Sequence, residues 1–209
     1  MSKTVKILNT NLSNLQSIKY AIESLDYKVQ NVDNIKSFKQ NEIVVIPGVG
    51  NYSQAMQNLK PNFSNLKEIA DMKNLKILGI CLGMQLLFSS SEEGGKNGFN
   101  FLSGKVQKLD RLGVTKIPNI GWKKVQFTNT EFKKFNNEFF YFVHSYAAVP
   151  ENPENILGKT MINDSTITSF VSDEKNRIGR YVGCQFHPEK SGLIGLKFLD
   201  HVLNALSEK

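Results

Sequence analysis

The chain has 209 residues, of which 40% are hydrophobic and 22% charged, and a chain of this length can bury a substantial core. No apolar run approaches the roughly 20 residues that span a bilayer, and the N-terminal MSKTVKILNTN lacks the features of a signal peptide. The net charge of +7 comes from lysines spread along the chain rather than from a basic stripe. We therefore expect one soluble, cytoplasmic domain over residues 1–209 that binds neither nucleic acid nor membrane.

The first eighty residues alternate between strand and helix patterns. Residues 5–8 are predicted to form a buried strand, and residues 28–32, 43–46 and 76–80 are predicted to form further strands. Apolar residues at helical spacing follow in 12–25, 52–59 and 65–72. This alternation predicts an α/β fold whose central, mostly parallel sheet is covered by helices on both faces.

Beyond residue 99 the sequence changes to short β-rich pieces. They cover 104–108, 122–127, 139–143, 166–171 and 181–186, and a helical pattern over 193–206 closes the chain. The pieces are typical of antiparallel additions to the same sheet. We expect a mixed sheet in a three-layer sandwich of the Rossmann-like or flavodoxin-like kind.

Cys81, one of only two cysteines, lies between two glycines in GICLG, where a strand runs into a helix. The pattern G-x-C-x-G is the cysteine counterpart of the strand-turn-helix elbow that lifts a serine nucleophile above a sheet. The N-terminus of the following helix favours the thiolate form of such a cysteine. Cys184 alternates with apolar residues on a strand and is interpreted as a structural thiol.

A nucleophilic cysteine needs a base, and the chain has three histidines. His187 ends a predicted strand and is followed by Pro188 and Glu189. Residues two apart on extended chain project to the same side, so Glu189 can hold one imidazole nitrogen while the other faces Cys81. His201 lies in the closing helix and is interpreted as solvated or interfacial.

The segment PGVG, residues 47–50, also follows a predicted strand. Its glycines permit unusual backbone angles, so Val49 or Gly50 can supply one donor of an oxyanion hole. The N–H of Leu82, directly after the nucleophile, is the other candidate. Each such donor is worth roughly 3 to 4 kcal/mol in acyl-transfer transition states.

Taken together, PGVG, GICLGMQ, YFVHSY and QFHPEKSG resemble the class I glutamine amidotransferases. Within that family, their order is most similar to the glutaminase subunit of imidazole glycerol phosphate synthase, over nearly the whole chain. The resemblance implies that Cys81 is the nucleophile, His187 the general base and acid, and Glu189 the group that orients the base.

The resemblance also implies a glutamine site and a partner interface. Each residue named below also has a purely structural interpretation, such as a loop charge, a helix cap or a core aromatic. Residues implied in holding glutamine are Gly48, Gln85, Glu93, His144, Ser145 and Tyr146. Residues implied at the partner interface are Asn14, Trp122, Tyr141 and Lys190.

The implied reaction is hydrolysis of L-glutamine through a γ-glutamyl thioester, with no metal and no cofactor. The ammonia would pass through an internal channel to a separate cyclase subunit with a (β/α)8 barrel, so the expected assembly is a heterodimer. An excised half of a fusion protein would also fit.

Two segments depart from the family pattern near the expected partner face. Residues 9–14, NTNLSN, replace Asp-Tyr-Gly-x-Gly-Asn, and residues 119–123, NIGWK, replace the ending of Pro-His-Met-Gly-Trp-Asn. They leave open a partner that aminates or amidinates surface sugars. A non-catalytic scaffold of the same fold is a further alternative, although such proteins usually lose the nucleophile or the base and this chain retains both.

Overall fold

The computed structural model describes residues 3–10, 15–94 and 98–209. Its main sheet has nine strands in the order β2-β1-β3-β4-β12-β11-β10-β7-β8, with parallel pairing from β2 to β12 and antiparallel pairing from β12 to β8. The strands in spatial order are β2 Lys28–Val32, β1 Thr4–Leu8, β3 Ile43–Ile46, β4 Lys76–Ile80, β12 Tyr181–Cys184, β11 Ser165–Ser172, β10 Ile156–Ile162, β7 Asn119–Phe127 and β8 Phe139–His144. The predicted mixed, mostly parallel core with antiparallel additions is confirmed.

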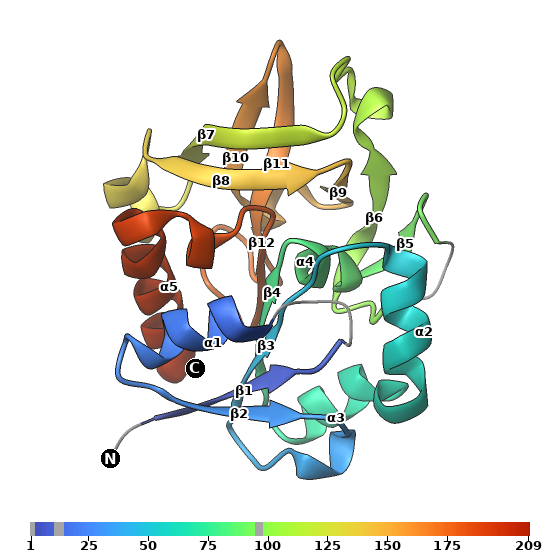
Figure 1. Cartoon of the computed structure of the whole chain (residues 1–209), viewed down its shortest axis with the longest axis vertical. Coiled ribbons are helices and arrows are strands. Elements are labelled where there is room, and N and C mark those ends of the chain that lie inside the picture. Colours follow the sequence, from blue (N-terminus) through green and yellow to red (C-terminus); the bar gives the residue numbers. More distant parts are fainter. Residues whose placement is uncertain (1–2, 11–14, 95–97) are drawn as a thin grey trace.

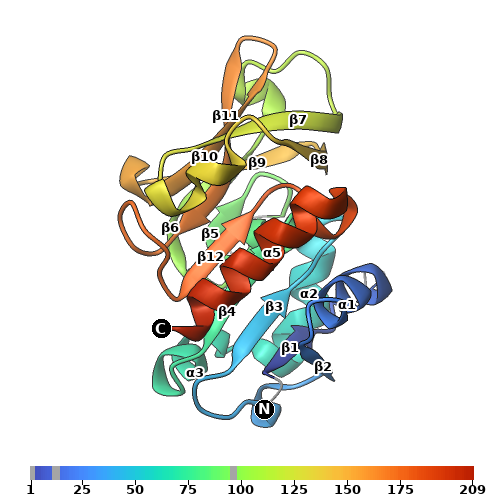
Figure 2. The same cartoon turned by 90° about the vertical axis from the view of Figure 1, so that its left-hand side faces the viewer.

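Helices cover both faces of the parallel half (Figures 1 and 2). Helices α1 (Leu15–Glu23) and α5 (Gly192–Ser207) bury their apolar stripes against one face, and α2 (Tyr52–Phe63) and α3 (Leu66–Met72) against the other. Alternate residues of β3 divide between the two cores, with Val45 on the α5 side and Val44 on the α2 side. This division produces the expected three layers.

Helix α2 is longer than predicted, since it continues through Pro61 to Phe63 rather than ending at residue 59. Phe63 is buried against Phe38, with ring centroids 6.3 Å apart. Burial of a phenylalanine contributes roughly 2 kcal/mol or more, which offsets the poor local helix propensity.

The antiparallel half contains strands that periodicity did not reveal. Strand β10 was missed, and β7 begins three residues before the predicted start. A second sheet of the described residues, in the order β5-β6-β9, was also only partly predicted, because short strands resemble loops in sequence. Its strands are β5 Phe88–Ser91, β6 Leu102–Lys108 and β9 Tyr146–Pro150.

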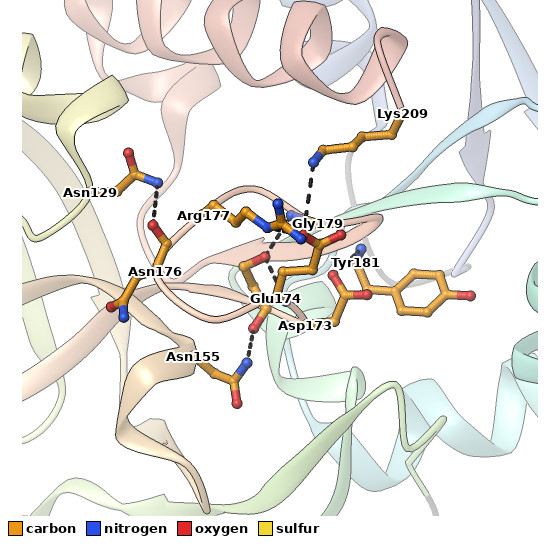
Figure 3. Close-up of polar contacts among 10 residues, drawn as sticks. Asn129, Asn155, Asp173, Glu174, Asn176, Arg177, Gly179, Tyr181 and Lys209 are labelled. Carbon is orange, nitrogen blue, oxygen red and sulfur yellow. Dashed lines mark hydrogen bonds and ion pairs between the residues drawn. The ribbon is translucent and has the colours of Figure 1, made fainter.

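The amino end of β12 is held by a dense polar network in the loop that leads into it (Figure 3). Ser172 Oγ accepts from Gly179 N at 2.8 Å and from Glu174 N at 3.2 Å. Asp173 Oδ1 accepts from Tyr181 N at 2.9 Å, and Glu174 pairs with Arg177 and Lys209. These bonds fix the start of β12, the strand that leads to His187.

Among the described residues, no helix is both long enough and apolar enough to cross a bilayer.

Candidate active site

The backbone turns sharply at Cys81, between β4 and the short helix α4 (Leu82–Leu86). Cys81 has φ 54° and ψ −110°, a conformation that L-residues other than glycine rarely adopt. The turn fits because its flanking glycines pack closely: a Cβ on Gly79 would lie 2.6 Å from Gly83 O, and one on Gly83 1.7 Å from Ile46 O. The predicted elbow is therefore present, and larger residues at 79 or 83 would clash with backbone.

His187 and Glu189 form a buried pair at the carboxyl end of β12. His187 Nδ1 lies 2.7 Å from Glu189 Oε1, and the two side chains are 2% and 8% exposed. Because a carboxylate only accepts, Nδ1 carries a proton. His187 Nε2 is buried and has no well-formed hydrogen bond to any described residue, but the Cys81 sulfur lies close enough to raise the pKa of His187.

The charge of His187 depends on its two acidic neighbours. Burial alone would lower the pKa of His187, but the Cys81 sulfur and the Glu189 carboxylate outweigh this effect and raise the pKa to about 10. The imidazolium form is thus favoured at neutral pH when it faces a thiolate. Burial raises the pKa of the Cys184 thiol, and the nearby Glu189 and Cys81 raise it further, which agrees with a structural role for Cys184.

Cys81 opens into a cavity of about 400 Å³. Eight of the predicted glutamine and oxyanion residues line it with Cys81: Val49, Gly50, Leu82, Gln85, Glu93, His144, Ser145 and Tyr146. Lys190, predicted at the partner interface, lines it as well. Gly48 instead lines a neighbouring cavity of about 110 Å³ with His187, Glu189 and Lys190.

Glu93 and Gln85 each present to the cavity an oxygen that can accept hydrogen bonds from a ligand. Glu93 Oε2 accepts from Tyr52 N at 2.8 Å, at the first residue of α2, and this bond fixes the carboxylate. Gln85 Nε2 donates to Tyr146 O at 2.9 Å and to Gln185 Oε1 at 3.1 Å. A carboxylate and an amide oxygen are both suited to an ammonium group.

His144 lines the cavity, but both of its ring nitrogens already have protein partners. Nδ1 lies 2.8 Å from Tyr146 O and must carry the proton, so Nε2 accepts from Asn119 Nδ2 at 3.0 Å. Burial lowers the pKa of His144 to about 4, although the bond to Tyr146 opposes this shift. His144 is therefore a neutral residue that braces the wall of the cavity.

One predicted oxyanion donor is engaged within the protein. Leu82 N–H donates to Gly48 O at 3.3 Å, and it becomes available to a substrate only when that bond is released. Val49 and Gly50 lie at the same cavity, and Gly50 has φ 94°, a left-handed conformation suited to glycine.

The described residues predicted at the partner interface reach the surface near the site. Trp122 is 51% exposed on β7 and packs edge-on against Tyr141 of β8, with ring centroids 6.0 Å apart. Lys190 is exposed and lines both cavities. Asn14 lies outside the described residues.

Three roles were missed or misjudged from sequence. Gln185 is fully buried, and its Nε2 lies 3.6 Å from Cys81 Sγ; the only signal was its place in QFHPEKSG, two residues before His187. Asn119 partners His144, which only the pairing of β7 with β8 reveals. His201 is half-buried against Phe132 and Phe135 and accepts from Lys134, so the solvated reading of it was wrong.

Comparison with known proteins agrees with this geometry. Residues 6–199 match the family Glutamine amidotransferase class-I. The imidazole glycerol phosphate synthase subunit HisH of Prochlorococcus marinus (strain MIT 9211) is 36% identical, with 100% of this chain and 98% of the relative covered. HisH of Methanocaldococcus jannaschii is 38% identical, with 97% of this chain and 100% of the relative covered.

Solved structures share the fold at lower identity. The structure of PurLQS from Thermotoga maritima gives a TM-score of 0.73 at 18% identity, and covers 99% of this chain and 100% of that one. A crystal structure of a glutamine amidotransferase also gives 0.73, at 14% identity, with 98% and 99% covered. The elbow cysteine, the carboxylate-braced histidine and the full-length similarity lead to one conclusion: the chain belongs to the class I glutamine amidotransferase family.

Proposed function

We propose that this chain is the glutaminase subunit of an imidazole glycerol phosphate synthase and acts in histidine biosynthesis in the cytoplasm. The observation that carries the proposal is the proximity of Cys81, which lines the 400 Å³ cavity, to the His187–Glu189 pair, which lines the smaller neighbouring cavity, in a chain similar to HisH proteins over its full length. The similarity to HisH supports the pathway, and the geometry supports the chemistry.

The reaction begins when the Cys81 thiolate attacks the side-chain amide carbon of glutamine. The carbon–nitrogen bond breaks as the His187 imidazolium gives its Nε2 proton to the leaving ammonia, and a γ-glutamyl thioester remains. Water then loses a proton to the neutral His187 and attacks the thioester, which releases glutamate and restores the thiolate. Glu189 holds Nδ1 and stabilises the imidazolium through both steps.

Substrate recognition follows from the fixed groups of the cavity. Glu93 is the expected partner of the glutamine ammonium, and Gln85 contributes its Oε1 to the same ligand. Backbone groups at Ser145 and Tyr146 complete the wall, which His144 braces. Gly48 contributes indirectly, through its bond to Leu82 N–H.

The state of the oxyanion hole supports dependence on a partner. While Leu82 N–H donates to Gly48 O, the predicted oxyanion donors that remain are the backbone N–H groups of Val49 and Gly50. The loss of one such donor costs about 10² to 10³ in rate. We therefore expect slow hydrolysis by the chain alone.

The partner in this proposal is a cyclase subunit with a (β/α)8 barrel, joined in a heterodimer that acts as a lyase. Trp122 and Tyr141 expose an aromatic pair of the kind enriched at protein interfaces. Lys190 lies at the rim of the smaller cavity beside His187, where an ammonia channel toward the partner would begin. Asn14 retains its proposed interface role from the sequence alone.

The test is to copurify the chain with its natural cyclase and to measure glutamate release alone, with the cyclase, and with the cyclase and its nucleotide ligand. We expect slow hydrolysis alone, strong stimulation in the complex, and glutamine-dependent product formation that matches the ammonia-dependent reaction. Cys81→Ala should lower glutamate release by at least about 10⁴-fold and spare the ammonia-dependent reaction. Full glutaminase activity in that variant would refute the catalytic assignment, and recovery of only a sugar-modifying enzyme would refute the pathway.

A further inference from the structure

A fully buried amide, that of Gln185, connects the sulfur of Cys81 to the side chain of Gln85, and both Cys81 and Gln85 line the glutamine cavity. Gln185 directly follows β12, and none of its surface is exposed. Its N–H donates to Ser169 O at 2.9 Å, and the preceding carbonyl of Cys184 accepts from Cys81 N–H at 2.8 Å. Because a buried amide without partners costs free energy, the contacts of this side chain indicate its role.

One backbone carbonyl sets the orientation of two side-chain amides. Tyr146 O can only accept, so the Gln85 atom 2.9 Å away is Nε2. The same Nε2 donates its second hydrogen to Gln185, so the Gln185 atom 3.1 Å away is Oε1. Gln185 Nε2 is therefore the atom that faces Cys81 Sγ, at 3.6 Å.

The hydrogen bonds of Gln185 affect two groups of the proposed reaction, the sulfur of Cys81 and the side chain of Gln85. At the sulfur, an N–H donor favours the thiolate over the thiol, because hydrogen bonds to a charged acceptor are roughly twice as strong as neutral ones. At the cavity, both N–H groups of Gln85 are occupied, so its Oε1 is the atom that it can offer to a ligand. That oxygen accepts from an ammonium group and repels a carboxylate.

We propose that Gln185 is a further functional residue of the glutaminase site: its amide donates to the Cys81 sulfur and holds Gln85 in the orientation that presents Oε1 to glutamine. Gln185 is thus a catalytic residue through its contact with the sulfur and a positioning residue through Gln85. The inference rests on the proposed function, in which Cys81 is the nucleophile and Gln85 a glutamine ligand.

The first test replaces both polar atoms of Gln185 with a side chain of similar length. In Gln185→Met, the rate of Cys81 alkylation by iodoacetamide at pH 7 should fall about tenfold. The full chain is used without a partner, and mass spectrometry locates the adduct. In the complex, kcat for glutamine should fall and KM should rise several-fold, since Gln85 also loses its acceptor.

Gln185→Glu separates the two roles. A carboxylate still accepts from Gln85 Nε2, but it has no N–H for the sulfur. We expect alkylation to slow at least as much as in Gln185→Met, while KM for glutamine remains within about twofold of the wild-type value. This variant decides the sulfur contact even if Gln185→Met fails to fold.

The matched control is Thr160→Val, which removes another buried hydrogen bond, from Thr160 Oγ1 to Lys124 O at 2.7 Å in β10. Its alkylation rate should equal that of the wild type. Folded Gln185 variants with the wild-type rate would overturn the inference. A lower rate, together with a wild-type complex that hydrolyses no glutamine, would instead overturn the proposed function and leave the contact between Gln185 and sulfur standing.

Discussion

The two ends of strand β12 differ in how their polar groups are satisfied. At the carboxyl end, His187 Nε2 and Glu189 Oε2 are buried and have no hydrogen-bond partner among the described residues. Cys81, which directly follows the neighbouring strand β4, has a left-handed backbone conformation. At the amino end, the loop of Figure 3 satisfies Ser172 and Asp173 with several short bonds.

This difference shows that groups that cost folding free energy lie at the end of β12 where the reaction would occur. Unpaired buried groups and unusual backbone angles each cost about 1 to 3 kcal/mol, and His187, Glu189 and Cys81 combine both costs where ligands meet an open α/β sheet. At the amino end, Glu174 Oε2 also lacks a hydrogen bond, but Glu174 pairs with Arg177 and Lys209. The polar network at the amino end makes no contact with the cavity and holds the strand in place. Substitutions at the carboxyl end should therefore change activity, and those at the amino end should change stability.

The largest effect should come from Glu189→Gln, which keeps the shape of the pair but removes its charge. We expect kcat to fall about 10³- to 10⁴-fold, by analogy with carboxylates that orient a catalytic histidine. Glu189 helps to raise the pKa of His187, so the loss of activity at high pH should begin at lower pH than in the wild type, where it centres near pH 10.

Glu189→Gln should also weaken the pH dependence of folding stability. Because the folded pKa of His187 is raised, the stabilising contribution of its protonation is present below the unfolded value of about 6.5 and is lost as the pH rises through about 10. Unfolding measured across this window should show a smaller decline in Glu189→Gln. The control is Glu151→Gln at an exposed site, and equal pH profiles for both variants would contradict the assigned role of Glu189.

An intermediate effect is expected at the amino end from Ser172→Ala. Ser172 is fully buried, and its loss leaves Glu174 N–H and Gly179 N–H without their acceptor. The free energy of unfolding in urea should fall by about 2 kcal/mol, with glutaminase activity per folded molecule unchanged. Ser64→Ala, at an exposed serine, should change stability by less than about 0.5 kcal/mol. A selective loss of kcat in Ser172→Ala would show that the two ends are coupled.

The smallest effect concerns the conformation of Cys81. Cys81→Gly should be more stable to urea than Cys81→Ala by about 1 kcal/mol, because glycine adopts φ 54° without strain and this gain exceeds its greater loss of entropy on folding. In helix α5, Ala205→Gly should show the opposite sign, by about 1 kcal/mol. If alanine were the more stable residue at position 81, the nucleophile would not be strained.

Chemistry that depends on neighbouring residues was predictable from sequence. Gly79, Cys81 and Gly83 lie within five residues of one another, so tight-turn sterics were enough to place them. His187 and Glu189 are paired as predicted, but Glu189 lies in a 3-10 helix, Pro188–Lys190, rather than on the expected extended chain. Of the first-half strands, β1, β3 and β4 were well predicted because buried strands are nearly continuous apolar runs, whereas β2 is mostly exposed. The short antiparallel strands lacked that signal, and β5, β9 and β10 were missed.

The sequence by itself determined the elbow at Cys81, the pairing of His187 with Glu189, and the alternating layers of the parallel half. Only the tertiary structure decided that burial keeps His144 neutral while Asn119 donates to it, that Gly48 O accepts from Leu82 N–H, and that Gln185 connects the sulfur to Gln85. The physical reason is distance along the chain. These contacts join segments that strand pairing and the elbow bring together, and a hydrogen bond between distant residues leaves no periodic pattern in the sequence.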